Sequence, residues 1–370
     1  ERQTKTLAAG VDVIMANLRE AAHTPVPPLP DHTHALVVLT AYPRDPRSDE
    51  RGSSWIMNAQ AERACLRSTE NATVLAEYIR QLGFDARVHS ATTSDVHLGK
   101  CALAAGLTVW EDGVLQAPWI GTRFGLAVVT TDMTLAPDMP LAPLREQPWS
   151  TLKGPHWQLG THGGTSARTV DPFANRDFAD GGHPFETLKR VENPTTYIDA
   201  PNVPRIPKRT DMFARGQFGD MGPKVQNAMK GGHHVIKSAP AAAQRRLLGA
   251  LILLQDGEVN PEKFGADPAT NAANLKAASY FLGADAAGVS ACPDWTWYSH
   301  DATGTPIDPP HDQARSLIID QGFETMEGGS GDDWIAVSQS MRAYLRFSSL
   351  GGVIGQHLRN LRYASKAHTV

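Results

Sequence analysis

Cysteine is scarce in this chain of 370 residues. The three cysteines, Cys65, Cys101 and Cys292, lie far apart and form no CxxC pair. Small disulfide-stapled domains and zinc sites built from thiolates both need more cysteines, at closer spacing. The sequence therefore argues against a disulfide framework and against a thiolate zinc site.

Long apolar runs and an excess of one charge are also missing. The longest apolar run, "LLGALILL" at 247–254, is much shorter than the roughly 20 residues that a membrane-spanning helix needs. The formal net charge is −4 and charges of both signs are interspersed, so no basic field attracts a phosphate backbone. We expect a cytoplasmic protein with no transmembrane segment and no nucleic-acid partner. The first residue is Glu1 rather than Met, which indicates a trimmed start.

One phrase occurs twice in the sequence: "RACLRSTE" at 63–70 and "RAYLRFSS" at 342–349. An offset of 279 residues (344 − 65) aligns 55–90 with 334–369 without a gap, and 11 of those 36 positions are identical. Internal similarity of this extent indicates two copies of one structural unit. At the centre of the phrase, Cys65 in the first copy corresponds to Tyr344 in the second.

Each copy predicts a strand followed by a helix. Apolar residues recur at helical spacing after position 341, with charged residues between them. Strand candidates lie upstream, "HALVVLTAY" at 34–42 and "SLIID" at 316–320. We also expect each helix to end in an aromatic residue followed by a strand-like segment, and we expect further helices over 223–254 and 271–285.

The repeat predicts three parts of the chain. The first copy covers 1–141, a connector with a helical segment covers 142–270, and the second copy begins at 271. The connector is rich in Gly and Pro, and we expect it to wrap over both copies. The second copy stops at Val370, before the counterpart of 99–138, so we expect the polypeptide to continue or another chain to complete the fold.

Four motifs suggest chemistry but lack a required partner or spacing. "DVHLGK" at 95–100 nearly matches a cobalt-ligating DxHxxG motif, but its glycine comes one residue early, which disfavours His97 as a ligand. Adjacent histidines in "GGHHVIK" point in different directions and favour a surface turn. "HGGT" at 162–165 has no GxSxG nucleophile elbow, and "GGSGDDW" at 328–334 is not a GxGxxG loop.

Tyr344 stands beside small residues on its predicted helix. Neighbours at helical spacing include Phe347, Ser348 and Gly351. A strip of glycines lets a flat group approach the backbone, but it equally allows another chain segment to pack closely. Arg342 and Arg346 point away from the phenol because they lie two residues from it.

The second copy resembles the cobalamin-dependent reductive dehalogenases of the soluble, catabolic type. "FLGADAAGVSACPDWTWYSH" at 281–300 is similar to the helix, strand and Trp-x-Tyr-Ser segment of that family. "RAYLRFSSLGGVIGQHLRNLRY" at 342–363 is similar to the helix that carries the family's catalytic tyrosine, 19 residues (363 − 344) before an aromatic residue. Tyr344 falls on that tyrosine. "AAGLTVWEDGVLQAPWIGTRFGLAVVTTDMTLAPD" in the first copy resembles a later part of the same fold.

The resemblance implies an α+β fold with a duplicated, nitroreductase-like cobalamin-binding module, a sheet flanked by helices, whose second copy is incomplete in this chain. The first copy is a degenerate duplicate, because Cys65 stands at the tyrosine position. The reaction that the resemblance implies is reductive dehalogenation of a halogenated organic compound, aromatic or phenolic, with Tyr344 as the proton donor. Residues that could bind the cofactor are Phe347, Ser348, Gly351, Trp297 and Tyr298, although core packing explains the aromatic ones equally well.

The resemblance also implies two [4Fe–4S] clusters and an electron-donating reductase or ferredoxin. A [4Fe–4S] cluster ordinarily takes four thiolates, so three scattered cysteines cannot hold one, and the clusters are expected beyond Val370. A homodimer is compatible with the sequence. Two other functions stay open: an epoxyqueuosine reductase-like cobalamin enzyme, which the acidic balance disfavours, and a non-catalytic scaffold subunit.

Overall fold

The fold begins with a three-stranded antiparallel sheet. In the computed structural model, the described residues are 32–42, 46–49, 52–118, 120–144, 191–193, 195–231, 239–261, 266–321 and 338–368. The strands are β1 (His34–Ala41), β2 (Ala86–His89) and β5 (Phe124–Thr131), in the order β1–β5–β2. The central strand, β5, is an apolar and β-branched run buried along most of its length, as its position between two strands requires. The strand expected at 34–42 is confirmed.

Helix α3 (Gln60–Gln81) packs on this sheet and is buried on two faces. One face, which includes Ala72, Ala76 and Ile79 at helical spacing, forms a core with β2 and β5. The other face contacts the next layer of helices. Strand β5 approaches α3 very closely at Gly125, where an added Cβ would lie 2.7 Å from the backbone of Ala64 and Cys65.

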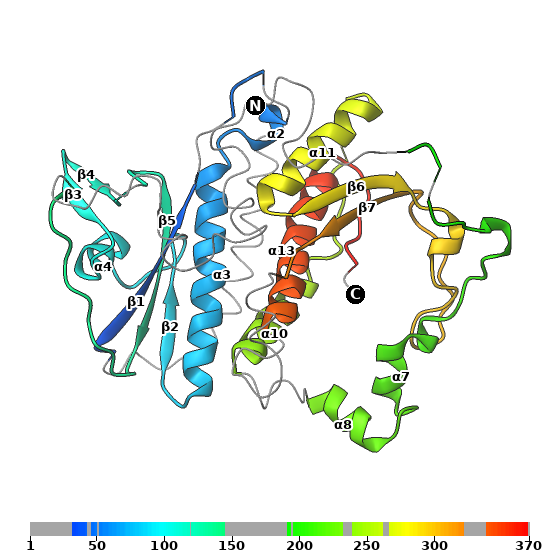
Figure 1. The fold of residues 1–370 in the computed structure, drawn as a ribbon, viewed down its shortest axis with the longest axis horizontal. Coiled ribbons are helices and arrows are strands. Elements are labelled where there is room, and N and C mark those ends of the chain that lie inside the picture. The colour runs from blue at the N-terminus through cyan, green and yellow to red at the C-terminus, as the bar shows by residue number, and fades with distance from the viewer. Residues whose placement is uncertain are drawn as a thin grey trace.

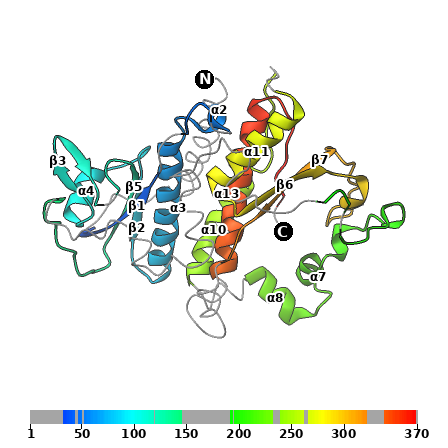
Figure 2. The ribbon, with the colours of Figure 1, turned by 45° about the horizontal axis from the view of Figure 1, so that its top comes forward.

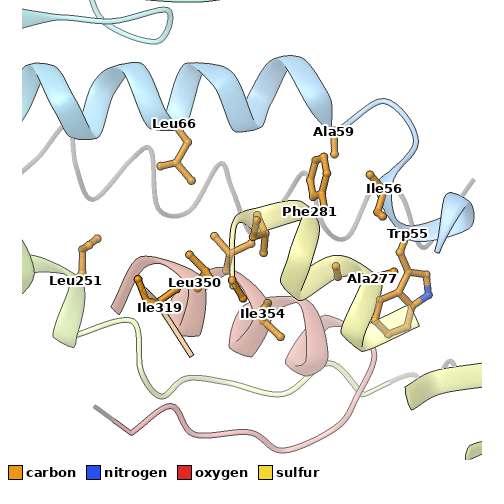
Figure 3. Packing of buried hydrophobic residues seen from close by; sticks show 14 of the residues in the cluster. Trp55, Ile56, Ala59, Leu66, Leu251, Ala277, Phe281, Ile319, Leu350 and Ile354 are labelled. Atoms are coloured by element: carbon orange, nitrogen blue, oxygen red, sulfur yellow. The ribbon is translucent and has the colours of Figure 1, made fainter. Parts of the chain in front are cut away.

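The next layer contains three helices, as Figures 1 and 2 show. They are α10 (Ala239–Ile252), α11 (Pro268–Leu282) and α13 (Ser338–Asn360). Together with the short helix α2 (Ser53–Ile56) and α3, they enclose the largest apolar cluster of the described residues (Figure 3). Its fully buried side chains include Trp55, Phe281 and Ile354. Residues from both halves of the sequence therefore share one core.

Strands β6 (Ala286–Ala291) and β7 (Gln313–Ile318) form an antiparallel pair beside α11 and α13 (Figure 1). The second strand begins three residues earlier than the sequence predicted and ends two residues sooner. The ladder ends where the Asp285 amide donates to the Ile318 carbonyl at 2.9 Å. Asp320 lies beyond it and donates its amide to the Asp285 carboxylate at 2.6 Å.

The remaining elements are short. Asp112 and Gly113, both with positive φ, turn the chain between β3 and β4, as a two-residue hairpin requires. The other short elements are β3 (Val109–Glu111), β4 (Val114–Gln116), α4 (Leu98–Ala104), η2 (Ala200–Asn202), η3 (Lys208–Thr210), α7 (Met212–Phe218), α8 (Pro223–Gly231) and η4 (Asp294–Thr296).

Most of the expected helices are present. The helix expected at 271–285 is α11, whose first turn is capped by Asp267 and whose end is capped by Gly283. The pattern over 223–254 divides into α8 and α10, and 232–238 lies outside the described residues, as do the motifs at 162–165 and 328–334. After α13, the segment 364–368 has no strand partner among the described residues. Its Ala367 amide donates to the Gln255 carbonyl at 2.8 Å instead.

No helix within the described residues is both long and apolar enough to cross a bilayer.

Candidate functional site

Tyr344 lies in the second turn of α13 and is half-buried. Ser348 and Gly351 follow it by four and seven residues, so they share its side of the helix. The structure thus places the predicted tyrosine, serine and glycine in a row along α13.

Ser348 contributes a buried hydroxyl to this row. Its side chain is 0% exposed, and its Oγ has no hydrogen-bond partner among the described residues. A buried hydroxyl without a partner loses its hydration and gains nothing in return. Such an atom is the kind of group that a bound molecule would satisfy.

The glycine side of α13 is covered by the chain itself. A Cβ added at Gly351 would lie 2.9 Å from the Cβ of Ala367. One turn further, the Ser365 hydroxyl donates to the Gly355 carbonyl at 2.9 Å. Of the two interpretations of the glycine strip, close packing of another segment is the one that this geometry supports at Gly351.

Phe347 faces the interior rather than the row that contains Tyr344. It packs against the largest apolar cluster and is partly buried. Its role within the described structure is core packing. A cofactor-binding role for Phe347 stays a sequence prediction.

Trp297 and Tyr298 lie on the loop after β6, among basic side chains. The Trp297 ring is 5.8 Å from that of His368 and 6.4 Å from that of His311, while Lys208 sits 4.7 Å over the Tyr298 ring. Since His368 follows Ala367, the residue that covers Gly351, the Trp297 ring lies beside the segment that packs on the glycine side of α13.

The backbone of this loop is fixed by Arg205 from the connector. Its guanidinium donates to the carbonyl oxygens of Trp297 at 3.3 Å and of Tyr298 at 2.8 Å. The Tyr298 hydroxyl also donates to the Asp211 carboxylate at 3.4 Å. These contacts account for the position of the aromatic pair by packing and hydrogen bonding.

Cys65, the counterpart of Tyr344 in the repeat, lies in a closely packed part of α3. It lies where β5 approaches α3 most closely, beside Gly125. Burial, followed by the charge of Glu62, raises the pKa of the Cys65 thiol. A buried thiol with a raised pKa is a poor nucleophile at neutral pH.

The described residues contain no group of three or more His, Cys, Asp or Glu side chains that could share a metal ion. His97 instead caps α4, because its Nδ1 accepts the Lys100 amide at 3.2 Å.

The sequence analysis assigned no contact to four arginines that lie near α11 and α13. Arg63 and Arg67 of α3, and Arg346 of α13, each donate to a carbonyl oxygen at the end of α11. Arg342 donates to the Asp320 carbonyl at 3.3 Å. All four arginines occupy identical positions in the repeated phrase RAxLR, which was the sequence feature that could have identified them.

Solved structures of reductive dehalogenases are similar to this chain over nearly its whole length. One, described by its mechanism for B12-dependent dehalogenation, is 34% identical and covers 97% of this chain and 58% of its own, with a TM-score of 0.82. The catabolic reductive dehalogenase NpRdhA is 34% identical over 100% of this chain and 59% of its own, with a TM-score of 0.83. The chain belongs to the reductive dehalogenase family. The suspected resemblance is confirmed.

NpRdhA has also been solved in complex with 3-bromo-4-hydroxybenzoic acid, and that structure is 34% identical over 98% of this chain, with a TM-score of 0.82. The present chain spans 59% of that reductive dehalogenase. No protein-family model and no curated protein matches the chain.

Proposed function

We propose that this chain is the N-terminal part of a cobalamin-dependent reductive dehalogenase that acts on halogenated aromatic compounds, including phenolic ones. The observation that carries the proposal is the similarity to B12-dependent and catabolic reductive dehalogenases at 34% identity over 97–100% of the chain. The substrate class follows from the relative that was solved with a brominated hydroxybenzoic acid.

The structure of the chain is also consistent with the proposed duplication. The offset of 279 carries the bounds of α3, Gln60–Gln81, onto 339–360, and α13 spans Ser338–Asn360. The same offset carries β1, His34–Ala41, onto 313–320, where β7 spans Gln313–Ile318. We propose that 1–141 is a degenerate module, 142–270 a connector and 271–370 the start of the working module.

The described residues fit a cobalamin only in part. The buried Ser348 hydroxyl without a partner fits a bound group, and the half-buried Tyr344 lies one turn away. Gly351 and Phe347 do not fit, because Ala367 covers the glycine and the phenyl ring packs into the core. Residues other than these four would therefore supply much of the cofactor site.

Tyr344 is proposed as the proton donor. Bound cobalamin supplies the reduced cobalt that removes the halogen, and the carbon that loses the halogen needs a proton in its place. A phenol carries an acidic hydroxyl proton and can act as a general acid. The position of Tyr344 along α13, at the end of the row with Ser348, supports this role.

The electrons must enter from outside these residues. A [4Fe–4S] cluster takes four thiolates, while this chain has three separated cysteines. We propose that two [4Fe–4S] clusters bind elsewhere in the protein and receive electrons from a reductase or ferredoxin. A cytoplasmic location and a homodimer also remain proposals.

Tyr344→Phe tests the role of the phenol. In the cobalamin-loaded protein, with 3-bromo-4-hydroxybenzoic acid as the trial substrate, we expect kcat to fall at least about 100-fold, because general acid catalysis contributes on the order of 10²–10⁴. The absorption spectrum of bound cobalamin should not change. Tyr78→Phe, on α3, is the matched control and should retain activity.

Full turnover by Tyr344→Phe would show that another group supplies the proton. Absence of dehalogenation in the unaltered, cobalamin-loaded protein would instead favour the scaffold function.

A further inference from the structure

Three arginines converge on the C-terminal end of α11. Arg63 Nη1 donates to the Phe281 carbonyl at 2.7 Å, and Arg67 Nη2 donates to the Leu282 carbonyl at 3.2 Å. From the opposite side, Arg346 Nη2 donates to the Gly283 carbonyl at 3.2 Å. Three consecutive carbonyl groups that lack partners within the helix are each satisfied by a guanidinium group.

The electrostatics of a helix end favour this arrangement. Unpaired carbonyl groups give the C-terminal end of a helix a partial negative charge, which cations stabilise. Nearby carboxylates of Glu70, Asp285 and Asp320 offset the repulsion between the arginines. Burial, followed by the charges of Arg67 and Arg342, nevertheless lowers the pKa of Arg346. The arginines are therefore held close together against their mutual repulsion.

Gly283 makes the convergence sterically possible. Its φ is +101°, and a Cβ there would lie 2.4 Å from Arg346 Nη2 and 2.7 Å from Arg67 Nη2. The two guanidinium groups, one from α3 and one from α13, thus meet over the same glycine.

Arg346 and Tyr344 lie on opposite sides of α13. Two residues along an α-helix correspond to a rotation of about 200°. A contact that fixes Arg346 at the back of the helix consequently fixes the direction in which Tyr344 points at the front. The phenol itself needs no partner on the α11 side for this to hold.

We propose that Arg67 and Arg346, together with Arg63, form an arginine clamp that positions Tyr344 by tying α13 to α3 through the end of α11. This inference rests on the proposed function of Tyr344. Through this clamp, the first half of the chain would help to position the proton donor, although its own residue at the tyrosine position is Cys65. The arginines are positioning residues, since none of them needs to touch the substrate.

Arg67→Met in the cobalamin-loaded protein tests the clamp. The arginine on α3 is chosen because its side chain is 23% exposed, so its replacement disturbs the fold less than that of Arg346. A misplacement of about 1 Å can cost on the order of 100-fold in rate, so we expect kcat to fall about 10- to 100-fold with KM and bound cobalamin unchanged within about two-fold. Arg67→Lys should restore part of the activity.

Arg80→Met is the matched control. Arg80 is also on α3 and also donates to a carbonyl oxygen, that of Ala86 at 3.1 Å, but it lies outside the clamp. Its replacement should leave kcat near that of the unaltered protein. An equal loss of kcat in Arg67→Met and Arg80→Met would overturn the proposal.

Amide hydrogen exchange over 343–347 separates the clamp from the proposed function. We expect faster exchange in Arg67→Met and unchanged exchange in Arg80→Met, because the loosened turn of α13 opens more often. Unchanged exchange in Arg67→Met would refute the clamp even if Tyr344 is the acid. Full activity of Tyr344→Phe together with faster exchange in Arg67→Met would refute the acid role and leave the clamp in place.

Discussion

Replacement of Gly283 by alanine probes a crowded point of the structure, where two arginine side chains meet. The glycine ends α11 with a φ of +101°, a conformation that costs an L-residue about 1–2 kcal/mol. The new Cβ would also lie 2.4 Å from Arg346 Nη2 and 2.7 Å from Arg67 Nη2, closer than real Cβ contacts. The clashing atoms are the ends of two flexible side chains, so both guanidinium groups can shift, and the shift weakens their hydrogen bonds to the Leu282 and Gly283 carbonyls.

The weakening of these two hydrogen bonds accounts for the larger part of the expected destabilisation. Hydrogen bonds that involve a charged group contribute roughly 1.5–3 kcal/mol each, and a shift of the two guanidinium groups loses part of that contribution. Together with the backbone strain, we expect Gly283→Ala to lower the free energy of unfolding by about 3 kcal/mol. The measurement is urea-induced unfolding followed by circular dichroism.

Gly304→Ala isolates the backbone contribution. Gly304 has a φ of +97°, close to that of Gly283, but an added Cβ would meet nothing within 4 Å. This variant should lose only the roughly 1–2 kcal/mol that a left-handed alanine costs. Equal losses in the two variants would refute the steric argument, because strain alone would then explain both.

Two further changes test buried groups. Ser348→Ala should leave the free energy of unfolding of the cofactor-free protein unchanged or slightly raised, because the Ser348 hydroxyl has no partner among the described residues. Ser68→Ala should lower it by about 1 kcal/mol, because the Ser68 hydroxyl donates to the buried Gly125 carbonyl at 3.1 Å. Equal losses in urea unfolding would contradict this. Burial lowers the pKa of His357 from 6.5 to about 4, so between these pH values the unfolded chain binds a proton at His357 and the folded chain does not. The free energy of unfolding should therefore fall by about 3 kcal/mol as pH drops from 6.5 to 4. His357→Gln should abolish most of this slope in unfolding curves recorded across that range, and an unchanged slope would assign the effect to other groups.

The sequence predicted the elements of the fold that depend on local pattern. Strand β1 was expected from an apolar run and helix α11 from its helical pattern, and both are properties of neighbours in the chain. Strand β7 was found with its bounds displaced, because its end is decided by a hydrogen bond from Asp285, 33 residues (318 − 285) from its partner Ile318. Pairing between distant residues leaves no local trace.

The candidate site divides in the same way. Helical spacing alone placed Ser348 and Gly351 on the side of Tyr344, and the structure agrees. Spacing could not show that Ala367 covers Gly351 or that Phe347 turns into the core. These facts depend on which segment returns to pack against the helix.

By itself, the sequence determined the family, the repeat and the helix that carries Tyr344, because motif spacing and periodicity are written in the order of the residues. Only the tertiary structure decided what the repeated arginines do. Arg63 and Arg67 lie more than 200 residues before the α11 carbonyls that they bind, and Arg346 lies 63 residues after Gly283. The end of one helix attracts cations from two others only when packing has brought all three together, and no linear pattern encodes that meeting.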